Sequence, residues 1–519
     1  MVLQYFSYST LVAVVFVGYS LSVLYDRYTK EKKILRLGHT APLVKTQFIW
    51  GLDFPIHSTI ALKKKLALEF WDWLFDHTGV AAKHSYTAEV RLLASSRVIF
   101  TGDVENIKAI LTTQFQDYGK GEQFHGEWKD FLGDSIFTTD GKMWQESRNL
   151  IRPMFIREKV ADLDLVEEHV QKLMKLLGPG DGSMVQLDKL FFRFSLDAST
   201  HFLFGQSVNS LDNPANEFAT AFDEVQRVQV LEGRLGPFRH WYPKRSKSAG
   251  LKFLDKFMQP IIDAAMQLSP EELETKLSKS DTFIHALARF TRDKKVMRDQ
   301  IMSLLLAGRD TTACTLSWLF LELSRNPRVV KKLHEEIRNV IGDSGRPPTY
   351  QEIKDMKYLT WVINETLRLY PVVPFNVRAA LKDTTLPRGG GPDGMEPLGL
   401  LKGTPVGYST LFMQRRRDIY PPISETFPYD PLDWVPDRWA TWTPPAWTFI
   451  PFNGGPRICI GMNFAQMEMG YTVVRLLQHY EKIINFNNRS DMHIEIVVTP
   501  AYGTNVGLVK KSSVSEKTS

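Results

Sequence analysis

Only two cysteines, Cys314 and Cys459, occur among the 519 residues of the chain. Two thiols cannot supply a disulfide framework, a four-cysteine zinc site or a cysteine-ligated iron–sulfur cluster. They form at most one disulfide, or each acts by itself. With 43% apolar and 24% charged residues, the composition is that of an ordinary globular protein. The formal net charge of +6 is too diffuse to indicate nucleic-acid binding, and no nucleic-acid partner is expected.

The N-terminus predicts a membrane anchor. No charged residue occurs from Met1 to Tyr25, and a helix needs about 20 apolar residues to cross a bilayer. The following flank carries five basic against two acidic residues, which by the positive-inside rule keeps the rest of the chain in the cytosol. A cleaved signal peptide fits less well, because it needs positive charge before the apolar run and a small-residue cleavage site after it. We expect an anchor at 1–25, a basic linker at 26–40 and one large domain at 41–519.

Hydrophobic periodicity predicts a mainly α fold with a minor β portion. Short strands are expected between Ser85 and Phe100 and again over Ile494–Val509. Helices are expected over Glu158–Leu177, Leu251–Leu268, Arg298–Arg325, Tyr358–Tyr370 and Met462–Tyr480. The Pro- and Trp-rich stretch Tyr420–Pro456 is expected to be ordered but irregular.

Residues 389–394 fit the pattern G-x-G-x-x-G, which is found in dinucleotide-binding sites. That pattern must end a strand and open a helix whose N-terminus receives the pyrophosphate. Pro397, Gly399 and Gly403 follow, so no helix can start cleanly there. We interpret the segment as a glycine-rich turn.

Cys459 lies in an unusual setting, within Phe452–Gly461 and just before a predicted helix. The glycines of this segment allow the backbone to approach a large flat ligand closely. The N-terminal end of the helix and the positive charge of Arg457 are expected to favour a thiolate. A single thiolate without neighbouring Cys or His ligands suits one axial position of a metal already held by a macrocycle, whereas a lone buried cysteine is more often a packing residue.

The pattern F-x-x-G-x-R-x-C-x-G over Phe452–Gly461 resembles the haem-binding signature of the cytochromes P450. The resemblance implies the cytochrome P450 fold, haem b as cofactor and Cys459 as the axial thiolate ligand of its iron, a ligation that favours O–O cleavage. It covers nearly the whole chain. The domain at 41–519 is then a haem-thiolate monooxygenase domain.

A second motif is Ala307-Gly308-Arg309-Asp310-Thr311-Thr312, inside an otherwise apolar helix. Ala307, Asp310 and Thr311 are spaced i, i+3 and i+4, so they share one face. By resemblance this face lies over the haem, Ala307 borders the reacting carbon, and Asp310 and Thr311 are catalytic residues that relay protons through water. Cys314, one turn further on, is interpreted as a packing residue.

The pair Glu365 and Arg368 would usually be a minor surface salt bridge. In the family the matching E-x-x-R pair is buried and is joined by an arginine from a P-x-R-W segment, here Arg438. The resemblance therefore gives these three residues a structural role.

The resemblance also implies basic or aromatic residues that hold the haem propionates, because guanidinium groups bind carboxylates bidentately. These cofactor-binding positions are Trp144, Arg148, Arg378 and Arg457, with Phe452, Gly461 and Ala307 beside the haem.

Several segments, among them Leu306–Ala313, Leu386–Gly394 and Phe452–Gly455, are similar to the fungal branch that hydroxylates alkanes and fatty acids. The resemblance implies insertion of one atom of O2 into a C–H bond of a lipophilic substrate, at or near the chain end. Only 60 residues follow Cys459 (519 − 459), which we expect to be too few for a flavin domain. The implied partners are a separate NADPH-cytochrome P450 reductase, O2, the substrate and membrane lipid, with the chain in the endoplasmic reticulum membrane.

Other functions remain open at this point. The same chemistry could act on a secondary metabolite, a sterol or a xenobiotic. A haem-thiolate isomerase or dehydratase would not need the proton relay that Asp310 and Thr311 imply. A non-catalytic haem sensor and a membrane-tethered scaffold without haem are the alternatives outside enzymology.

Overall fold

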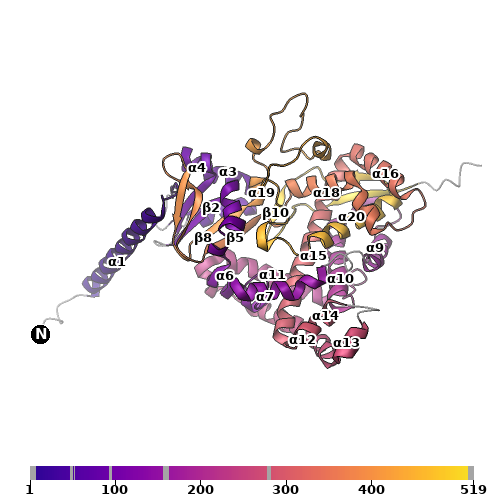
Figure 1. Cartoon of the computed structure of the whole chain (residues 1–519), viewed down its shortest axis with the longest axis horizontal. Helices are drawn as coiled ribbons and strands as arrows, with labels where there is room; N and C mark the ends of the chain where they lie inside the picture. The colour runs from indigo at the N-terminus through magenta and orange to yellow at the C-terminus, as the bar shows by residue number, and fades with distance from the viewer. Residues whose placement is uncertain are drawn as a thin grey trace, which may run out of the picture. The chain divides into compact units, whose positions relative to one another are not determined.

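The computed structural model describes residues 8–46, 51, 53–92, 96–155, 163–276 and 282–511 (Figure 1). The chain divides into two compact units. The first comprises Met1–Gly121, Phe375–Met413 and Gly454–Pro456. The second comprises Glu122–Pro374, Gln414–Asn453 and Arg457–Ser519.

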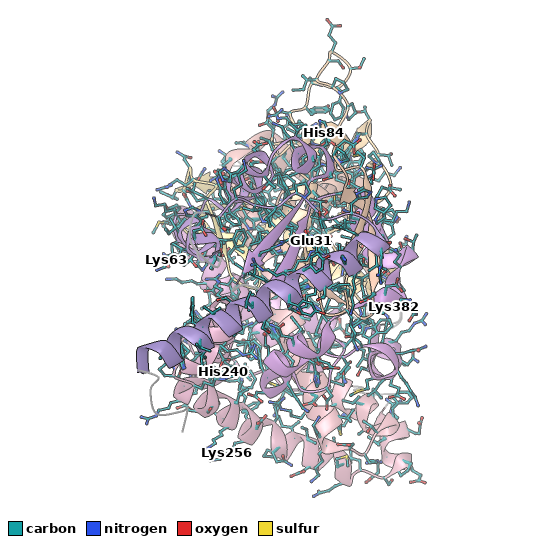
Figure 2. The ribbon with its side chains drawn as sticks, turned by 90° about the vertical axis from the view of Figure 1, so that its left-hand side faces the viewer. Glu31, Lys63, His84, His240, Lys256 and Lys382 are labelled. Carbon is teal, nitrogen blue, oxygen red and sulfur yellow. The ribbon has the colours of Figure 1, made fainter. Side chains whose placement is uncertain are left out.

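The first unit begins with a helix whose apolar side chains are exposed. Helix α1 spans Tyr8–Leu37, and Val15, Phe16 and Leu21 are each more than half exposed. Charged residues follow along the same helix, including Glu31, which is labelled in Figure 2. Among the described residues, no helix combines the length and the apolar character needed to cross a bilayer. The predicted anchor at 1–25 falls partly on residues 1–7, which lie outside the described residues.

A five-stranded sheet organises the first unit, with the strand order β1-β2-β8-β5-β3. Strands β2 and β8 are parallel, and the other neighbours are antiparallel. Trp71, Phe75 and Phe412 pack with Ala88 and Val90 of β1 in an aromatic core. The strands are β1 (Thr87–Leu92), β2 (Ser96–Thr101), β3 (Tyr118–Gly119), β5 (Phe375–Ala380) and β8 (Pro405–Ser409). The helices are α2 (Asp53–Lys63), α3 (Ala67–Thr78), α4 (Val80–Ser85), α5 (Val104–Lys108), the π-helix η2 (Ala109–Thr113), the 3-10 helix η3 (Phe115–Asp117) and α19 (Thr410–Met413).

The glycine-rich segment forms the turn of a hairpin. Strands β6 (Thr384–Gly390) and β7 (Glu396–Leu400) pair in antiparallel fashion around it. Gly394 has a φ of 77°, and a Cβ there would lie 2.2 Å from the backbone oxygen of Ala81. The prediction of a glycine-rich turn without a following helix is therefore confirmed.

Helix α15 (Lys294–Arg325) is the central element of the second unit, and most of its residues are buried. It begins where the Asp293 carboxylate caps the backbone N–H groups of Lys295 and Val296. It ends before Pro327, which starts the next helix. It packs against α10, α12, α14, α16, α18 and α20.

The second unit contains further helices, several of which contact α15. They are α6 (Gly121–Leu132), α7 (Gly141–Ile151), η4 (Arg152–Phe155), α9 (Asp164–Leu176), α10 (Leu187–Phe204), α11 (Glu217–Leu235), η5 (Gly236–Trp241), α12 (Arg245–Gln267), α13 (Pro270–Lys276), α14 (Phe283–Phe290), α16 (Pro327–Ile341), α17 (Tyr350–Asp355), α18 (Lys357–Leu369), η6 (Arg417–Ile419), η7 (Pro436–Ala440) and α20 (Met462–His479). The short 3-10 helix η8 (Gly455–Arg457) lies where the chain returns from the first unit. The strands are β4 (Asp181–Gln186), β9 (Tyr480–Asn485), β10 (Met492–Ile494), β11 (Val498–Pro500) and β12 (Asn505–Lys510).

The architecture confirms the predicted mainly helical fold with a minor sheet. The strands expected between Ser85 and Phe100 are β1 and β2, and those expected over Ile494–Val509 are β10, β11 and β12. The helix expected from Glu158 is observed from Asp164, and residues 156–162 lie outside the described residues. The stretch Tyr420–Pro456 is irregular apart from short 3-10 turns, as expected.

Candidate functional site

Cys459 follows a tightly constrained loop. Its backbone N–H donates to the Phe452 carbonyl at 2.9 Å, which closes the loop, and α20 begins three residues later behind its cap residue Gly461. Gly455 has a φ of 65°, and a Cβ there would lie only 1.9 Å from the carbonyl oxygen of Leu111. This glycine is therefore required by a close approach to another stretch of backbone. Cys459 is accessible to solvent as a residue, although much of the volume around its thiol is filled by protein.

Desolvation by the surrounding protein raises the pKa of the Cys459 thiol. The Gly461 backbone N–H and the charge of Arg148 act in the opposite direction. The guanidinium that lowers this pKa is thus that of Arg148, whereas the sequence led us to expect Arg457. In the polypeptide by itself the thiol is favoured, and a coordinating cation is what would make the group a thiolate.

Trp144, Arg148 and Arg457 lie together in the second unit. The Arg457 guanidinium carbon stands 4.6 Å from the centroid of a Trp144 ring, and that of Arg148 stands 5.9 Å from it. Arg148 donates to the Ile458 carbonyl at 3.0 Å, next to Cys459. Arg457 donates to the Thr139 carbonyl and to the Asp140 carboxylate, at 2.8 Å and 2.6 Å. The structure therefore brings three of the predicted propionate-binding residues to the Cys459 segment.

Arg378 belongs to the first unit. It lies on β5, is 4% exposed and donates to the Val377 carbonyl at 2.9 Å. Its guanidinium carbon lies 6.0 Å from the Tyr408 ring centroid.

The middle of α15 differs from the rest of that helix, because Leu306, Ala307, Gly308 and Thr311 are only partly buried. Ala307 and Thr311 share one face, and the Thr311 hydroxyl donates to the Ala307 carbonyl at 2.6 Å. Such partial exposure within a buried helix marks a small, polar face that packs less closely than its flanks.

Asp310 contacts helix α11, whereas Thr311 bonds within α15. It is 5% exposed, and its Oδ2 accepts a hydrogen bond from Gln226 Nε2 of α11 at 2.6 Å. Burial raises the pKa of Asp310, although the Arg309 charge and the Gln226 hydrogen bond work against the rise. Cys314 is fully buried, and burial raises the pKa of its thiol, as suits the packing role predicted for it.

Glu365 is the acceptor of a buried cluster between α18 and η7. Arg368 binds it through two parallel hydrogen bonds, Nε to Oε2 at 2.8 Å and Nη2 to Oε1 at 2.9 Å. Arg438 Nε donates to Oε1 at 2.8 Å, and the Trp439 indole donates to Oε2 at 3.0 Å. The backbone N–H of Val435 adds a further bond to Oε1 at 2.8 Å. Glu365, Arg368 and Arg438 are all fully buried.

Burial by itself would raise the pKa of Glu365, but the charges and hydrogen bonds of Arg368 and Arg438 lower it below its ordinary value. The carboxylate therefore stays ionised in the core. The guanidinium groups reach beyond it to backbone carbonyls, Arg368 to Pro431 and both arginines to Asp433. The cluster fixes the irregular segment around Pro431–Val435 to α18.

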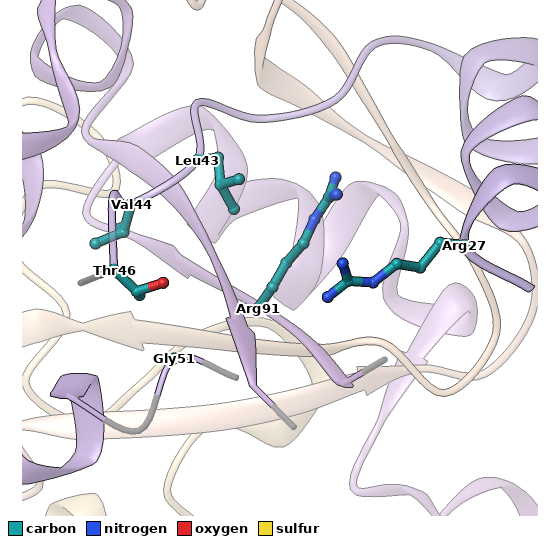
Figure 3. Close-up of a pocket in the computed structure, with 6 residues that line it drawn as sticks. All are labelled: Arg27, Leu43, Val44, Thr46, Gly51 and Arg91. Carbon is teal, nitrogen blue, oxygen red and sulfur yellow. The ribbon is translucent and has the colours of Figure 1, made fainter. Parts of the chain in front are cut away.

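Two cavities in the described parts of the chain contain none of the predicted site residues. One, of about 250 Å³, lies in the first unit, and in Figure 3 the Arg27 and Arg91 side chains extend into it beside Leu43. The other, of about 400 Å³, lies in the second unit between α10, α12 and α14 and is lined mainly by apolar residues and His285.

Two polar contacts at the site were not found from the sequence. One is Gln226 with Asp310, which lie 84 positions apart. The other is Glu468 on α20, which accepts from the Thr312 hydroxyl at 2.9 Å and whose pKa is raised by burial to about 7. The isolated acid between Met467 and Met469 was the signal that could have revealed the second contact. No local pattern marks the first.

The cytochrome P450 family model matches residues 77–506 of the chain. The chain belongs to the cytochrome P450 family. Cytochrome P450 monooxygenase pvhE of Talaromyces variabilis is 44% identical over 500 residues, which cover 92% of this chain and 91% of that protein. Cytochrome P450 52A1 of Candida tropicalis is 42% identical, covering 80% and 78% of the two chains, and cytochrome P450 52A4 of Candida maltosa is 38% identical, covering 89% and 87%.

As a cytochrome P450, the protein is a monooxygenase that binds haem iron with a cysteine thiolate ligand and uses O2, a substrate and a redox partner. The residues around Cys459 in the second unit are of the types needed to bind haem. Cys459 offers an accessible sulfur, and the basic and aromatic side chains needed for two carboxylates stand beside it.

We predict that Glu365→Ala prevents haem incorporation. The change leaves two buried guanidinium groups without their shared carboxylate, which typically costs about 3–5 kcal/mol of the free energy of unfolding. The matched control is Glu335→Ala, which removes an exposed partner 4.0 Å from Lys331 on α16. Absorbance spectra of the purified variants measure bound haem, and we expect normal loading in the control. A stable, haem-loaded Glu365→Ala protein would contradict the structural role.

Proposed function

We propose that this cytochrome P450 hydroxylates a long-chain alkane or fatty acid at or near its end. The segment Leu306–Ala313 carries the proposal, because it is similar to the fungal hydroxylase branch. In the structure, this segment also contains the partly exposed Leu306 and Ala307 in the middle of a buried helix. Beside the polar hydroxyl of Thr311, the side chains of Leu306 and Ala307 offer apolar contacts that suit a hydrocarbon chain, and Ala307 is the side chain proposed to border the reacting carbon.

Cys459 is proposed as the axial ligand of the haem iron, and the haem when bound supplies the site at which O2 is activated. Trp144, Arg148 and Arg457 would hold the propionates, because their donors and charges lie beside the Cys459 segment. Arg378 of the first unit is proposed as a further propionate partner. The loop residues Phe452 and Gly461 are proposed to lie beside the haem. The Phe452 carbonyl accepts a hydrogen bond from the Cys459 backbone N–H, which keeps the two residues close together.

Asp310 and Thr311 are proposed to deliver protons. Asp310 Oδ1 is buried and accepts no hydrogen bond within the described structure, and the Arg309 Nη1 atom lies 3.7 Å from it. We propose that this carboxyl oxygen holds the proton that is passed on. The Thr311 hydroxyl donates to the Ala307 carbonyl, which leaves its oxygen lone pairs able to accept from water. A carboxyl and a hydroxyl one residue apart can thus move a proton through an intervening water.

Electrons are proposed to come from a separate NADPH-cytochrome P450 reductase on the endoplasmic reticulum membrane. The exposed apolar side chains of α1 support attachment to that membrane, since large exposed apolar patches usually contact a partner or lipid. Basic residues follow them along the helix and suit the anionic cytosolic leaflet.

Membrane attachment predicts a simple fractionation result. The full-length chain expressed in yeast should stay in the membrane pellet after a carbonate wash. A chain lacking residues 1–25 should move largely to the soluble fraction while keeping its haem spectrum. Equal distribution of the two chains would contradict attachment through this segment.

Reconstitution with a fungal reductase tests the substrate. We expect oxygenated products from long-chain alkanes or fatty acids, with the hydroxyl at or next to the terminal carbon, identified by mass spectrometry. The panel should include sterols and aromatic compounds, because the name of pvhE, which is 44% identical, does not carry the 52A designation of the Candida relatives. Turnover of only those compounds would assign the protein to the alternative, the same chemistry on a secondary metabolite, sterol or xenobiotic.

A further inference from the structure

Helices α11 and α15 are joined at the proposed proton-relay carboxyl. Gln226 of α11 donates from Nε2 to Asp310 Oδ2 at 2.6 Å, and both side chains are at least 91% buried. The other carboxyl oxygen, Oδ1, accepts no hydrogen bond, and the Arg309 Nη1 atom lies 3.7 Å from it. The amide therefore holds one oxygen of the carboxyl, while the other is buried without a hydrogen bond and lies near the Arg309 charge.

A second hydrogen bond lies beside the first, and in this one α15 supplies the donor and α11 the acceptor. Arg309, the neighbour of Asp310 on α15, donates from Nη1 to Asp223 Oδ1 at 2.5 Å. Asp223 and Gln226 are three residues apart on α11, so they lie on the same face of that helix. The Arg309 guanidinium also lies against the rings of Phe192 and Phe222, at 5.6 Å and 5.5 Å. Two reciprocal contacts thus set the position of α11 relative to the relay residues.

The chemistry of the donor matters for a group that must exchange protons. A guanidinium or ammonium in the place of Gln226 would strongly favour the ionised carboxylate, whereas a neutral amide orients the carboxyl with a smaller effect on its pKa. The charged and titratable groups that act on Asp310 are Arg309, which lowers its pKa, and Asp223 and Glu495, which raise it. Cys314 also faces it from the same helix.

We propose that Gln226 is a positioning residue for Asp310, which orients the carboxyl for proton transfer and couples the position of α11 to proton delivery. The proposal rests on the role assigned to Asp310 above. It gives the α11 helix a part in the reaction that is separate from any contact with the substrate. A displacement of α11 would release the carboxyl from this orientation and would divert reducing equivalents to hydrogen peroxide or water.

The test compares Gln226→Met, which keeps the shape of the side chain but removes the donor, with Asp223→Asn, which changes the neighbouring contact. In haem-loaded, substrate-free protein, infrared difference spectra across pH report the protonated carboxyl band that Asp310→Asn removes. We expect the midpoint of this band to move to higher pH in Gln226→Met, because the lost hydrogen bond favoured the carboxylate. In Asp223→Asn it should move to lower pH, because a like charge has been removed.

Turnover supplies the second readout. With the reductase and an accepted substrate, Gln226→Met should lower product formed per NADPH by about tenfold and raise hydrogen peroxide correspondingly, with KM little changed. Asp223→Asn should keep most of the coupling. Gln226→Glu is the second variant if Gln226→Met does not fold, and the added like charge should also move the midpoint upward. An unchanged midpoint together with unchanged coupling in the Gln226 variants would overturn the proposal.

The two readouts separate this inference from the proposed substrate. The infrared titration needs no substrate, so a failure to hydroxylate alkanes or fatty acids leaves it informative. Conversely, normal hydroxylation by both Gln226 variants with an unshifted midpoint refutes the positioning role and leaves the proposed function standing.

Discussion

The buried carboxylate of Glu365 is the interaction on which the second unit most depends. It accepts from two guanidinium groups, an indole and a backbone N–H, and every one of these donors comes from α18 or from the segment around η7. An ion taken out of water is costly, so the arrangement is stable only because all of its partners are present together. The consequence is that an irregular segment is tied to α18 by several buried hydrogen bonds. That segment leads into the loop that presents Cys459.

Helix α15 carries polar and charged residues in its buried centre. This helix is buried along most of its length, yet its centre contains an arginine, an aspartate and threonines where apolar residues would pack better. The cost is met by specific partners: Asp223 for Arg309, Gln226 for Asp310 and Glu468 for Thr312. Polar groups kept in such positions, at a place where the helix is also partly exposed, are what a proton-handling site requires.

Much of this could be predicted from local sequence patterns. The i, i+3 spacing of Glu365 and Arg368 by itself indicated a surface salt bridge, and the family resemblance implied their burial together with Arg438. The structure brings these three residues together. The glycine-rich turn between β6 and β7 followed from the glycine and proline spacing, whereas the two strands that it joins were not predicted. The contact between Gln226 and Asp310 could not be predicted, because the two residues lie 84 positions apart and no local sequence pattern relates them. The influence of Arg148 on Cys459 was assigned to Arg457, since sequence proximity is a poor guide to which guanidinium reaches a given atom.

The reduced carbon-monoxide difference spectrum of the purified chain tests the central claim most directly, with Cys459→Ser measured alongside. The account predicts a thiolate-type Soret band in the native chain and its loss in the variant, since Cys459 is the proposed source of the sulfur ligand. A haem-loaded native chain without that band, or a Cys459→Ser protein that keeps it, would contradict the account.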